Sequence, residues 1–343
     1  MSKQLYIKLT DRCNFHCKHC YAGCTCFGEN MSERIADILI NNFKPEKERV
    51  DVIYHGGEPV LNFKILKKFV EAFKSNSFIT QNITTNLNYK ITKEILDILK
   101  EIHYITTSYD PDNLRFENLS QLERWKQNCK ILVENGIDLQ INIVLTQNLL
   151  NIRPELFIRF IKDIPCHQIH FERLTLTGRG SSIQIPKWED VDNWLLSFYK
   201  LNKEKFNLSV ETFRQYQLLA NGQLNGCFER CCSIKTRTIN PNGTIATCPN
   251  AYQTIIGSIF EQQKYDQNIL KILEAKERNK KIQCLSCDLY KYCNGDCFQQ
   301  NWQGKVCAFP KKLFREILKD EKKRLKTKLF LFSNMINLFI KMI

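Results

Sequence analysis

The stretch Leu5-Tyr-Ile-Lys-Leu-Thr-Asp-Arg-Cys-Asn-Phe-His-Cys-Lys-His-Cys20 joins a strand-like run directly to a loop with three cysteines. Residues 5–10 are rich in apolar and β-branched side chains, which predicts a β-strand. Three thiols within the next eight residues can wrap one loop around a polynuclear metal centre, and three ligands leave a four-iron cluster with one open iron, as catalysis needs. From the spacing alone, the alternative is a zinc site with a fourth ligand from Cys24, Cys26, His16 or His19.

Strand-like and helix-like segments alternate along the first half of the chain. Runs rich in Ile, Val, Thr and Tyr predict strands at 5–10, 50–55, 82–85, 102–108, 139–145 and 168–173. Capping residues and apolar stripes predict helices between them at 33–43, 63–74, 93–101, 119–135 and 154–162. Six such repeats predict an α/β fold with a parallel sheet, and the pattern alone does not separate a barrel from an open doubly wound sheet.

The composition is that of a globular protein with an unusual number of cysteines. The chain has 343 residues, 43% of them hydrophobic and 25% charged, so its length predicts about two domains. Its 16 cysteines are too sparse for a small disulfide scaffold, and no apolar signal segment precedes Leu5. Thiols clustered at short spacings are more often metal ligands than bridges in a reducing compartment. We therefore expect a cytoplasmic protein rather than a secreted, disulfide-bonded one.

The net charge is +14, and half of it lies in the last tenth of the chain. Residues 311–343 contain ten Lys or Arg against three acidic residues, with apolar residues at helical spacing. This pattern predicts a helix that either docks on the body or contacts an anionic membrane surface or a partner. A basic surface also permits nucleic-acid binding, so a non-catalytic metal-binding protein that binds nucleic acid is the hypothesis from another functional class.

A second group of cysteines begins at Cys227. Counting both ends, the segment from Cys227 to Cys307 contains nine cysteines, and residues 236–247 predict a β-hairpin about a Pro-Asn-Gly turn. Sets of four thiolates suit zinc or iron–sulfur clusters. The region therefore predicts a small, loop-rich domain whose order depends on bound metal.

The first three cysteines carry a resemblance to a known family. Cys13, Cys17 and Cys20 have the spacing Cys-x3-Cys-x2-Cys, with Tyr21 beside the last of them, and this resembles the signature of the radical S-adenosylmethionine (SAM) superfamily. The segment His55-Gly-Gly-Glu-Pro59, at the end of the second predicted strand, is similar to the Gly-Gly-Glu-Pro turn of that superfamily. Because the two motifs occur together, a plain turn is the weaker interpretation.

The resemblance implies a cofactor site at the carboxyl ends of the strands. In the family the three cysteines hold a 4Fe–4S cluster, and the glycine turn holds the amino group of SAM. Carried over, this makes Cys13, Cys17 and Cys20 the catalytic cluster ligands and assigns cofactor contacts to Tyr21, Gly56, Gly57, Glu58, Asn86, Ser108 and Arg115. Arg124 is the alternative to Arg115, whose spacing from Ser108 is shorter than is usual in the family.

The later cysteines resemble the seven-cysteine SPASM pattern, which binds two auxiliary 4Fe–4S clusters. The resemblance assigns one cluster to Cys227, Cys232, Cys248 and Cys297, and the other to Cys284, Cys287, Cys293 and Cys307. Cys231 competes with Cys232 for the same role. A pair of zinc ribbons is the alternative, because it uses the same four-thiolate chemistry. Four cysteines are left without a ligand role, namely Cys24, Cys26, Cys129 and Cys166.

The resemblance also implies an architecture. It implies a partial (β/α)6 barrel over 1–200, a helical linker at 201–225, a SPASM domain with a β-hairpin and short helices at 226–312, and a basic amphipathic helix at 313–343. Parallel barrels place their chemistry at the carboxyl ends of the strands.

The activity that the resemblance implies is radical peptide maturation. A 5'-deoxyadenosyl radical, formed from SAM, would abstract hydrogen from a peptide or protein substrate. The product would be a thioether or carbon–carbon crosslink, or another modification, in a ribosomally made peptide. The implied cofactors are SAM and three 4Fe–4S clusters. The implied partners are the substrate, an electron donor such as flavodoxin or ferredoxin, and a separate leader-peptide-binding protein.

Two alternatives stay open within the superfamily. Sulfatase-type maturases carry an Asp directly after the cysteine that corresponds to Cys248, and Pro249 stands there instead, which disfavours that oxidation. Tailoring of a small metabolite is the other alternative. Three thiolate-ligated clusters would carry about five negative charges and leave a net charge of roughly +9, which disfavours nucleic-acid binding. Any membrane-surface contact would then fall to the basic tail.

Overall fold

The computed structural model describes residues 3–111, 114–223, 236–261, 265–297, 300 and 302–342. Contacts divide the chain into two compact units, the first Met1–Pro186 with Arg230–Asn279 and the second Lys187–Glu229 with Lys280–Ile343. These units cut across the four predicted domain ranges, which stay a prediction.

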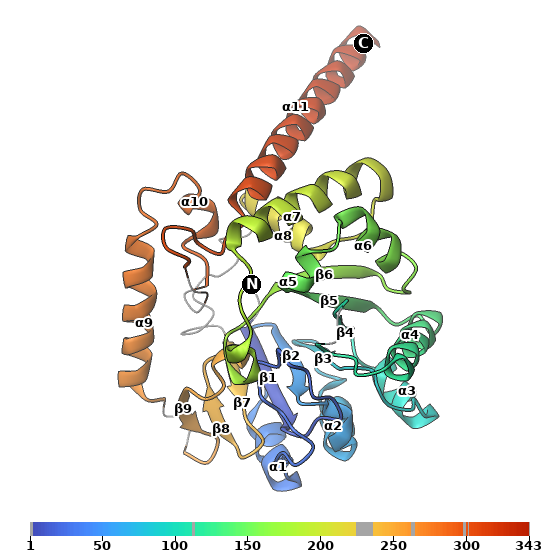
Figure 1. Cartoon of the computed structure of the whole chain (residues 1–343), viewed down its shortest axis with the longest axis vertical. Helices are drawn as coiled ribbons and strands as arrows, with labels where there is room; N and C mark the ends of the chain where they lie inside the picture. Colours follow the sequence, from blue (N-terminus) through green and yellow to red (C-terminus); the bar gives the residue numbers. More distant parts are fainter. Residues whose placement is uncertain are drawn as a thin grey trace. The chain divides into compact units, whose positions relative to one another are not determined.

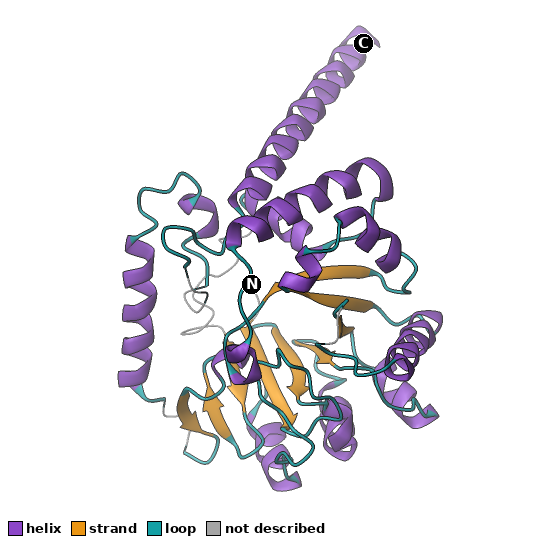
Figure 2. Cartoon of the chain, viewed as in Figure 1, coloured by secondary structure: helices purple, strands orange, loops and turns teal. Residues whose placement is uncertain are grey.

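Six parallel strands form the framework of the first unit (Figure 1, Figure 2). They are β1 (Lys3–Thr10), β2 (Val50–Gly56), β3 (Ile79–Thr84), β4 (Tyr104–Tyr109), β5 (Leu139–Leu145) and β6 (Gln168–Arg173). They pair in chain order from β1 to β6. A doubly wound sheet reverses its strand order at a switch point, whereas a barrel does not. The order therefore resolves the ambiguity in favour of a partial barrel and confirms the barrel part of the predicted α/β fold.

Helices connect successive strands, and Figure 1 shows α1 to α4 along the outer side of the curved sheet. They are α1 (Glu33–Asn42), α2 (Phe63–Phe73), α3 (Lys93–Lys100), α4 (Leu119–Glu134), α5 (Gln147–Leu150) and α6 (Pro154–Ile161). Two of these helices have capped starts, because the side chains of Ser32 and Thr92 accept hydrogen bonds from backbone amides in the first turns of α1 and α3. Fully buried side chains between helices and sheet include Leu66, Phe69, Ile83, Trp125 and Phe157.

The strand boundaries agree well with the expectation except at β3. The run 139–145 is β5 and the run 168–173 is β6, as predicted. Strand β3 begins at Ile79, three residues before the predicted start. The reason is Gln81, a polar residue that is fully buried because the Tyr54 hydroxyl donates to its side-chain oxygen over 2.5 Å. A polar residue at a buried position breaks the apolar pattern by which a strand is recognised.

Three further strands extend the sheet beyond β1. They are β7 (Thr236–Ile239), β8 (Thr244–Ala246) and β9 (Ile255–Ser258). Strands β7 and β8 form the predicted hairpin, but β7 also pairs in parallel with β1, from Gln4 with Thr236 to Ile7 with Ile239. The hairpin thus covers an edge of the barrel sheet that would otherwise expose unpaired backbone groups. Helix α9 (Gln267–Ile282) follows.

The second unit is helical. It contains α7 (Trp188–Leu201), α8 (Glu211–Ala220), the short α10 (Tyr290–Cys293) and α11 (Lys311–Met342). Helix α11 begins on α7, where the Asp192 carboxylate accepts the backbone N–H groups of Lys312 and Leu313 at 2.8 and 2.9 Å. Phe314 is fully buried among the α8, α10 and α11 side chains. The first part of the basic tail is therefore a docked helix, and none of the described helices is long and apolar enough to span a membrane.

Candidate active site

The three-cysteine loop lies between β1 and α1, at the carboxyl end of β1. Its entry is held by the Cys13 N–H, which donates to the Thr25 carbonyl over 2.8 Å. Cys17 is buried, while Cys13 and Cys20 are partly exposed. Cys17 and Cys20 act electrostatically on Cys13, and Cys20 acts on Cys17, so the loop gathers the three sulfurs in one neighbourhood. Among the described residues, no group of three or more His, Cys, Asp or Glu side chains is arranged to hold a single metal ion.

The ionisation of the thiols differs with their surroundings. Burial raises the pKa of Cys13 to about 12 and raises the pKa of Cys17 as well. For Cys20, a hydrogen bond from the Cys24 thiol lowers the pKa to about 5. Cys20 is therefore the thiol with the greatest thiolate character, and the thiolate is the form that binds metal.

The glycine turn that follows β2 presses directly on the start of this loop. The N–H groups of Gly57 and Glu58 donate to the carbonyls of Thr10 and Arg12, each over 2.8 Å. A Cβ on Gly57 would lie 2.1 Å from the Arg12 oxygen and 3.0 Å from the Cys13 Cβ. Gly56 has a φ of +146°, and a Cβ there would lie 2.3 Å from the Thr10 oxygen. Only glycine allows backbone to approach backbone this closely.

Glu58 joins this turn to the end of β3. Its carboxylate is fully buried and accepts hydrogen bonds from the Thr85 hydroxyl, the Asn86 N–H and the Val60 N–H, at 2.9, 2.7 and 3.1 Å. Burial raises the pKa of Glu58 to about 7, against the opposing effect of these three donors. Before any ligand binds, Glu58 thus holds two strand ends together.

Asn86 extends the connection to the cysteine loop. Its side-chain amide donates to the Asn14 side chain over 2.7 Å and lies 3.7 Å from the Cys13 sulfur. The structure therefore brings together Cys13, Gly57, Glu58 and Asn86, which sequence reasoning had assigned to one site from three separate strand ends.

Tyr21 contacts the other end of the glycine turn. Its hydroxyl lies 2.8 Å from His55 Nε2, and His55 Nδ1 accepts the Gly56 N–H over 2.7 Å. Burial lowers the pKa of His55 to about 4, so the ring is neutral and carries its proton on Nε2. Nε2 therefore donates to the Tyr21 oxygen, which leaves the Tyr21 hydroxyl proton available for an acceptor.

Arg115 lies in a compact ionic group at the end of β4. Its Nε donates to Asp110 Oδ2 over 2.7 Å, and His19 Nε2 lies 3.2 Å from the same oxygen. Although burial works against the charge, Arg115 and His19 lower the pKa of Asp110 below its ordinary value. Two atoms of this group, His19 Nδ1 and Asp110 Oδ1, are buried without a hydrogen-bond partner among the described residues. Buried polar atoms seldom stay unpaired, so these two predict a bound group.

The inner faces of β5 and β6 carry a chain of hydrogen-bonded polar side chains that sequence reasoning missed. It runs from Gln168 to Gln140, on to Asn142 and then to Glu172, with distances of 2.8, 2.8 and 2.6 Å. The Glu172 side chain is accessible to solvent, yet desolvation by the residues around it raises its pKa. Polar residues at alternate strand positions were the available signal, because buried parallel strands are normally apolar on both faces. Ser108 lies on the same inner side of the sheet, in register with Asn142.

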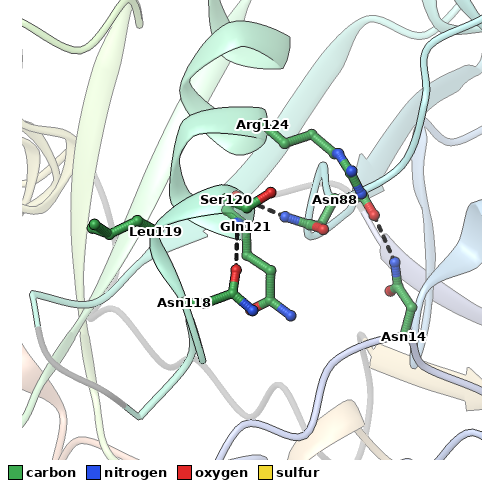
Figure 3. A pocket seen from close by; sticks show the side chains of 7 residues that line it. All are labelled: Asn14, Asn88, Asn118, Leu119, Ser120, Gln121 and Arg124. Atoms are coloured by element: carbon green, nitrogen blue, oxygen red, sulfur yellow. Dashed lines mark hydrogen bonds between the residues drawn. The ribbon is translucent and has the colours of Figure 1, made fainter.

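A polar opening of about 850 Å³ is lined by Asn14 of the cysteine loop (Figure 3). Asn14 and Asn88 line it together with the first turn of α4, and Arg124 extends over it from the next turn. Arg124, the predicted alternative to Arg115, thus lines this opening, whereas Arg115 belongs to the ionic group of Asp110 and His19. The opening offers amide and guanidinium groups to a ligand next to the cysteine loop.

The second unit has its own cysteine pocket, of about 640 Å³. All four cysteines that the SPASM resemblance assigns to one auxiliary cluster line it, namely Cys284, Cys287, Cys293 and Cys307. Of the other predicted set, Cys227 and Cys232, like the competing Cys231, lie outside the described residues. Cys248 is buried after β8 in the first unit, and Cys297 is partly exposed in the second.

Comparison with known proteins places residues 7–161 in the Radical SAM superfamily by its family model. A GTP 3',8-cyclase of Clostridium acetobutylicum is 28% identical over 73% of this chain and 82% of its own. The radical SAM cyclopropyl synthase TigE of Paramaledivibacter caminithermalis is 20% identical over 93% of this chain and 75% of its own.

Solved structures share the fold at low sequence identity. The structure of anSMEcpe with bound AdoMet and the Cp18Cys peptide superposes with a TM-score of 0.68 at 17% identity and covers 97% of this chain and 99% of that one. Streptococcus suis SuiB bound to its precursor peptide SuiA gives a TM-score of 0.60 at 22% identity and covers 87% of this chain and 72% of that one.

Proposed function

We propose that this chain, which carries a Radical SAM domain over residues 7–161, is a radical maturase that modifies a peptide or protein substrate. The observation that carries the proposal is the contact between the three-cysteine loop and the glycine turn, where Gly57 abuts Cys13 at the carboxyl ends of β1 and β2. Two structures of the same fold contain a bound peptide, which supports a peptide as the substrate class.

The residues present suit the group that the family binds. Three soft thiolate donors are ligands typical of iron–sulfur clusters, and three of them leave one iron open. The unpaired atoms His19 Nδ1 and Asp110 Oδ1 offer further partners to a polar cofactor nearby. When bound, a reduced 4Fe–4S cluster and SAM would together supply a carbon radical able to abstract hydrogen.

The tasks left to the protein are to bind the cofactors, to orient the substrate and to shield both from solvent. Cys13, Cys17 and Cys20 would hold the cluster, while the Gly56–Gly57 backbone lies where a ligand can approach without meeting a side chain. Tyr21 would donate its free hydroxyl proton, and Asn86, Ser108 and Arg115 would contact the cofactor from β3 and β4. Glu58 would fix the turn and need not touch SAM. The polar chain that ends at Glu172 would receive the substrate, because its amides match those of a peptide backbone.

We further propose that Cys284, Cys287, Cys293 and Cys307 hold an auxiliary 4Fe–4S cluster in their pocket, and that the second predicted set holds another. A site with all four positions filled by thiolates has no open iron. Its role would be to carry away the electron that is released when the substrate radical is oxidised to product.

Replacing Cys293 by alanine should therefore separate the two halves of the reaction. We expect anaerobic, reconstituted Cys293→Ala protein to release 5'-deoxyadenosine as wild type does, yet to convert less than about a tenth of the peptide, because the second oxidation step lacks its acceptor. Peptides encoded by short reading frames beside the gene are the substrates to use, and mass spectrometry would report the loss of two hydrogens per crosslink.

Cys166→Ala is the matched control, since Cys166 belongs to none of the predicted ligand sets. Full peptide conversion by Cys293→Ala would contradict the electron-transfer role proposed for the auxiliary cluster.

The relative named as a GTP 3',8-cyclase favours a second candidate, the tailoring of a small nucleotide. Conversion of GTP, with no mass change in any peptide, would replace the maturase by that activity.

A further inference from the structure

The cysteine loop is clasped by a segment distant in sequence, residues 177–180, which follows β6 and begins the short helix η2 (Gly178–Ser182). Arg179 makes three hydrogen bonds to this loop. Its Nε donates to the Cys17 carbonyl over 2.9 Å, an Nη donates to the Cys24 carbonyl over 2.8 Å, and its backbone N–H donates to the Cys20 carbonyl over 2.9 Å. Thr177 adds a fourth contact, from its hydroxyl to the Tyr21 carbonyl over 3.1 Å.

These contacts supply what the loop itself lacks. A loop that winds around a cluster has no regular ladder to satisfy its carbonyl groups, and unsatisfied buried carbonyls are costly. The Arg179 side chain satisfies two of them at once, on either side of Cys20. Only a planar guanidinium can bridge two carbonyls in this fixed geometry, whereas a lysine ammonium is a single point on a flexible stem.

Backbone packing makes the clasp tight. Gly178 has a φ of +54°, and a Cβ there would lie 2.5 Å from the Tyr21 oxygen and 2.6 Å from the Cys20 oxygen. A Cβ on Gly180 would lie 3.1 Å from the His19 oxygen. The two glycines that flank Arg179 therefore allow its backbone to lie directly against the loop.

The charge of Arg179 has a second consequence. Its guanidinium acts electrostatically on both Cys17 and Cys20. A thiolate-ligated cluster is anionic, and a fixed positive charge beside two of its ligands stabilises the more reduced, more negative state.

We infer that Arg179 is a positioning residue, which holds the cysteine loop in the conformation that receives a cluster and makes that cluster easier to reduce. The inference rests on the proposed function for the cluster, but the clasp on the loop itself does not require one. No sequence pattern marks the segment 177–180 as part of the site, because its partners lie more than 150 residues away.

Limited digestion with trypsin tests the clasp on protein without added iron, kept reduced. Lys18 is an exposed trypsin site inside the loop, and cleavage there needs local opening. We expect Arg179→Gln to be cut after Lys18 about tenfold faster than wild type, because charge-assisted hydrogen bonds are lost. Arg179→Lys should be cut nearly as fast as Arg179→Gln. The cleavage rate of Thr177→Val should lie between those of wild type and Arg179→Gln. Arg159→Gln, an exposed arginine on α6 that pairs with Glu155, should behave as wild type.

The second measurement is made after anaerobic reconstitution. We expect Arg179→Gln to take up less iron, and the cluster it does form to have a lower midpoint potential than wild type. Wild-type cleavage rates and potentials in Arg179→Gln would overturn the inference. A uniform loss of melting temperature in both Arg179 variants, with no selective cleavage at Lys18, would also overturn it. If wild type itself binds no iron while the cleavage difference persists, the proposed function fails and the clasp stands.

Discussion

Replacing Gly57 by alanine should lower the free energy of unfolding by about 3 kcal/mol, because the added methyl group has no space. It should also abolish iron binding by the three-cysteine loop. The methyl group would lie 2.1 Å from the Arg12 oxygen and 2.5 Å from the Arg12 carbonyl carbon. Both atoms are backbone, so the contact can be relieved only by moving the turn away from the cysteine loop. Cys13 would also be displaced, because the added Cβ would lie 3.0 Å from the Cys13 Cβ.

Gly136→Ala is the control for Gly57→Ala. Gly136 has a φ of +74°, and a Cβ there meets no atom within 4 Å, so this substitution carries only the cost of a left-handed backbone, about 1 kcal/mol. Chemical denaturation gives the stability, and iron content after reconstitution gives the site. A Gly57→Ala protein as stable as Gly136→Ala, with its full complement of iron, would show that the turn does not support the loop.

The second large effect is expected at Glu58. Glu58→Ala should lower the free energy of unfolding by about 3 to 5 kcal/mol, because it leaves the Thr85 hydroxyl and two backbone N–H groups without acceptors in a buried site. Glu58→Gln keeps the shape of the side chain and one oxygen, but it turns an amide N–H toward a donor. Its free energy of unfolding should therefore fall by less than that of Glu58→Ala. Equal stability of Glu58→Ala and wild type would contradict the structural role.

The same residue predicts a pH dependence. The pKa of Glu58 in the folded protein is about 7, above its ordinary value of 4.5, so the folded state favours the protonated carboxyl. Its favourable contribution is therefore complete below about pH 4.5 and is lost as the pH rises through about 7. Relative to Glu58→Gln, wild type should become less stable over this interval. A stability difference that stays constant with pH would mean that burial does not perturb this carboxyl.

Local patterns predicted the framework of the barrel because its determinants are local. Strands β5 and β6 alternate apolar and polar residues, and Ser32 and Thr92 are caps that act within one turn of their own helices. The strand that was misplaced, β3, fails for a tertiary reason, since Tyr54 lets the polar Gln81 occupy a buried position. The pairing of β7 with β1 was equally hidden, because nothing in the hairpin itself states which edge it will cover.

The candidate site was predictable where motifs carry it and not where distant residues complete it. The cysteine loop and the glycine turn were each legible, and Asn86 followed from its position at a strand end. The unpaired atoms of Asp110 and His19 were not predictable, because only the fold places them beside Arg115. Arg179 was missed for the same reason, as its carbonyl partners are irregular loop backbone that no side-chain pattern reveals.

One measurement tests the central claim most directly, which is that Cys13, Cys17 and Cys20 form a centre that cleaves SAM. Reconstituted protein, reduced with dithionite under anaerobic conditions, is incubated with SAM, and 5'-deoxyadenosine is quantified by chromatography. We predict steady release by wild type and none above background by Cys13→Ala, with Cys166→Ala equal to wild type. Equal release by wild type and Cys13→Ala, or none by either while wild type carries its iron, would contradict the account.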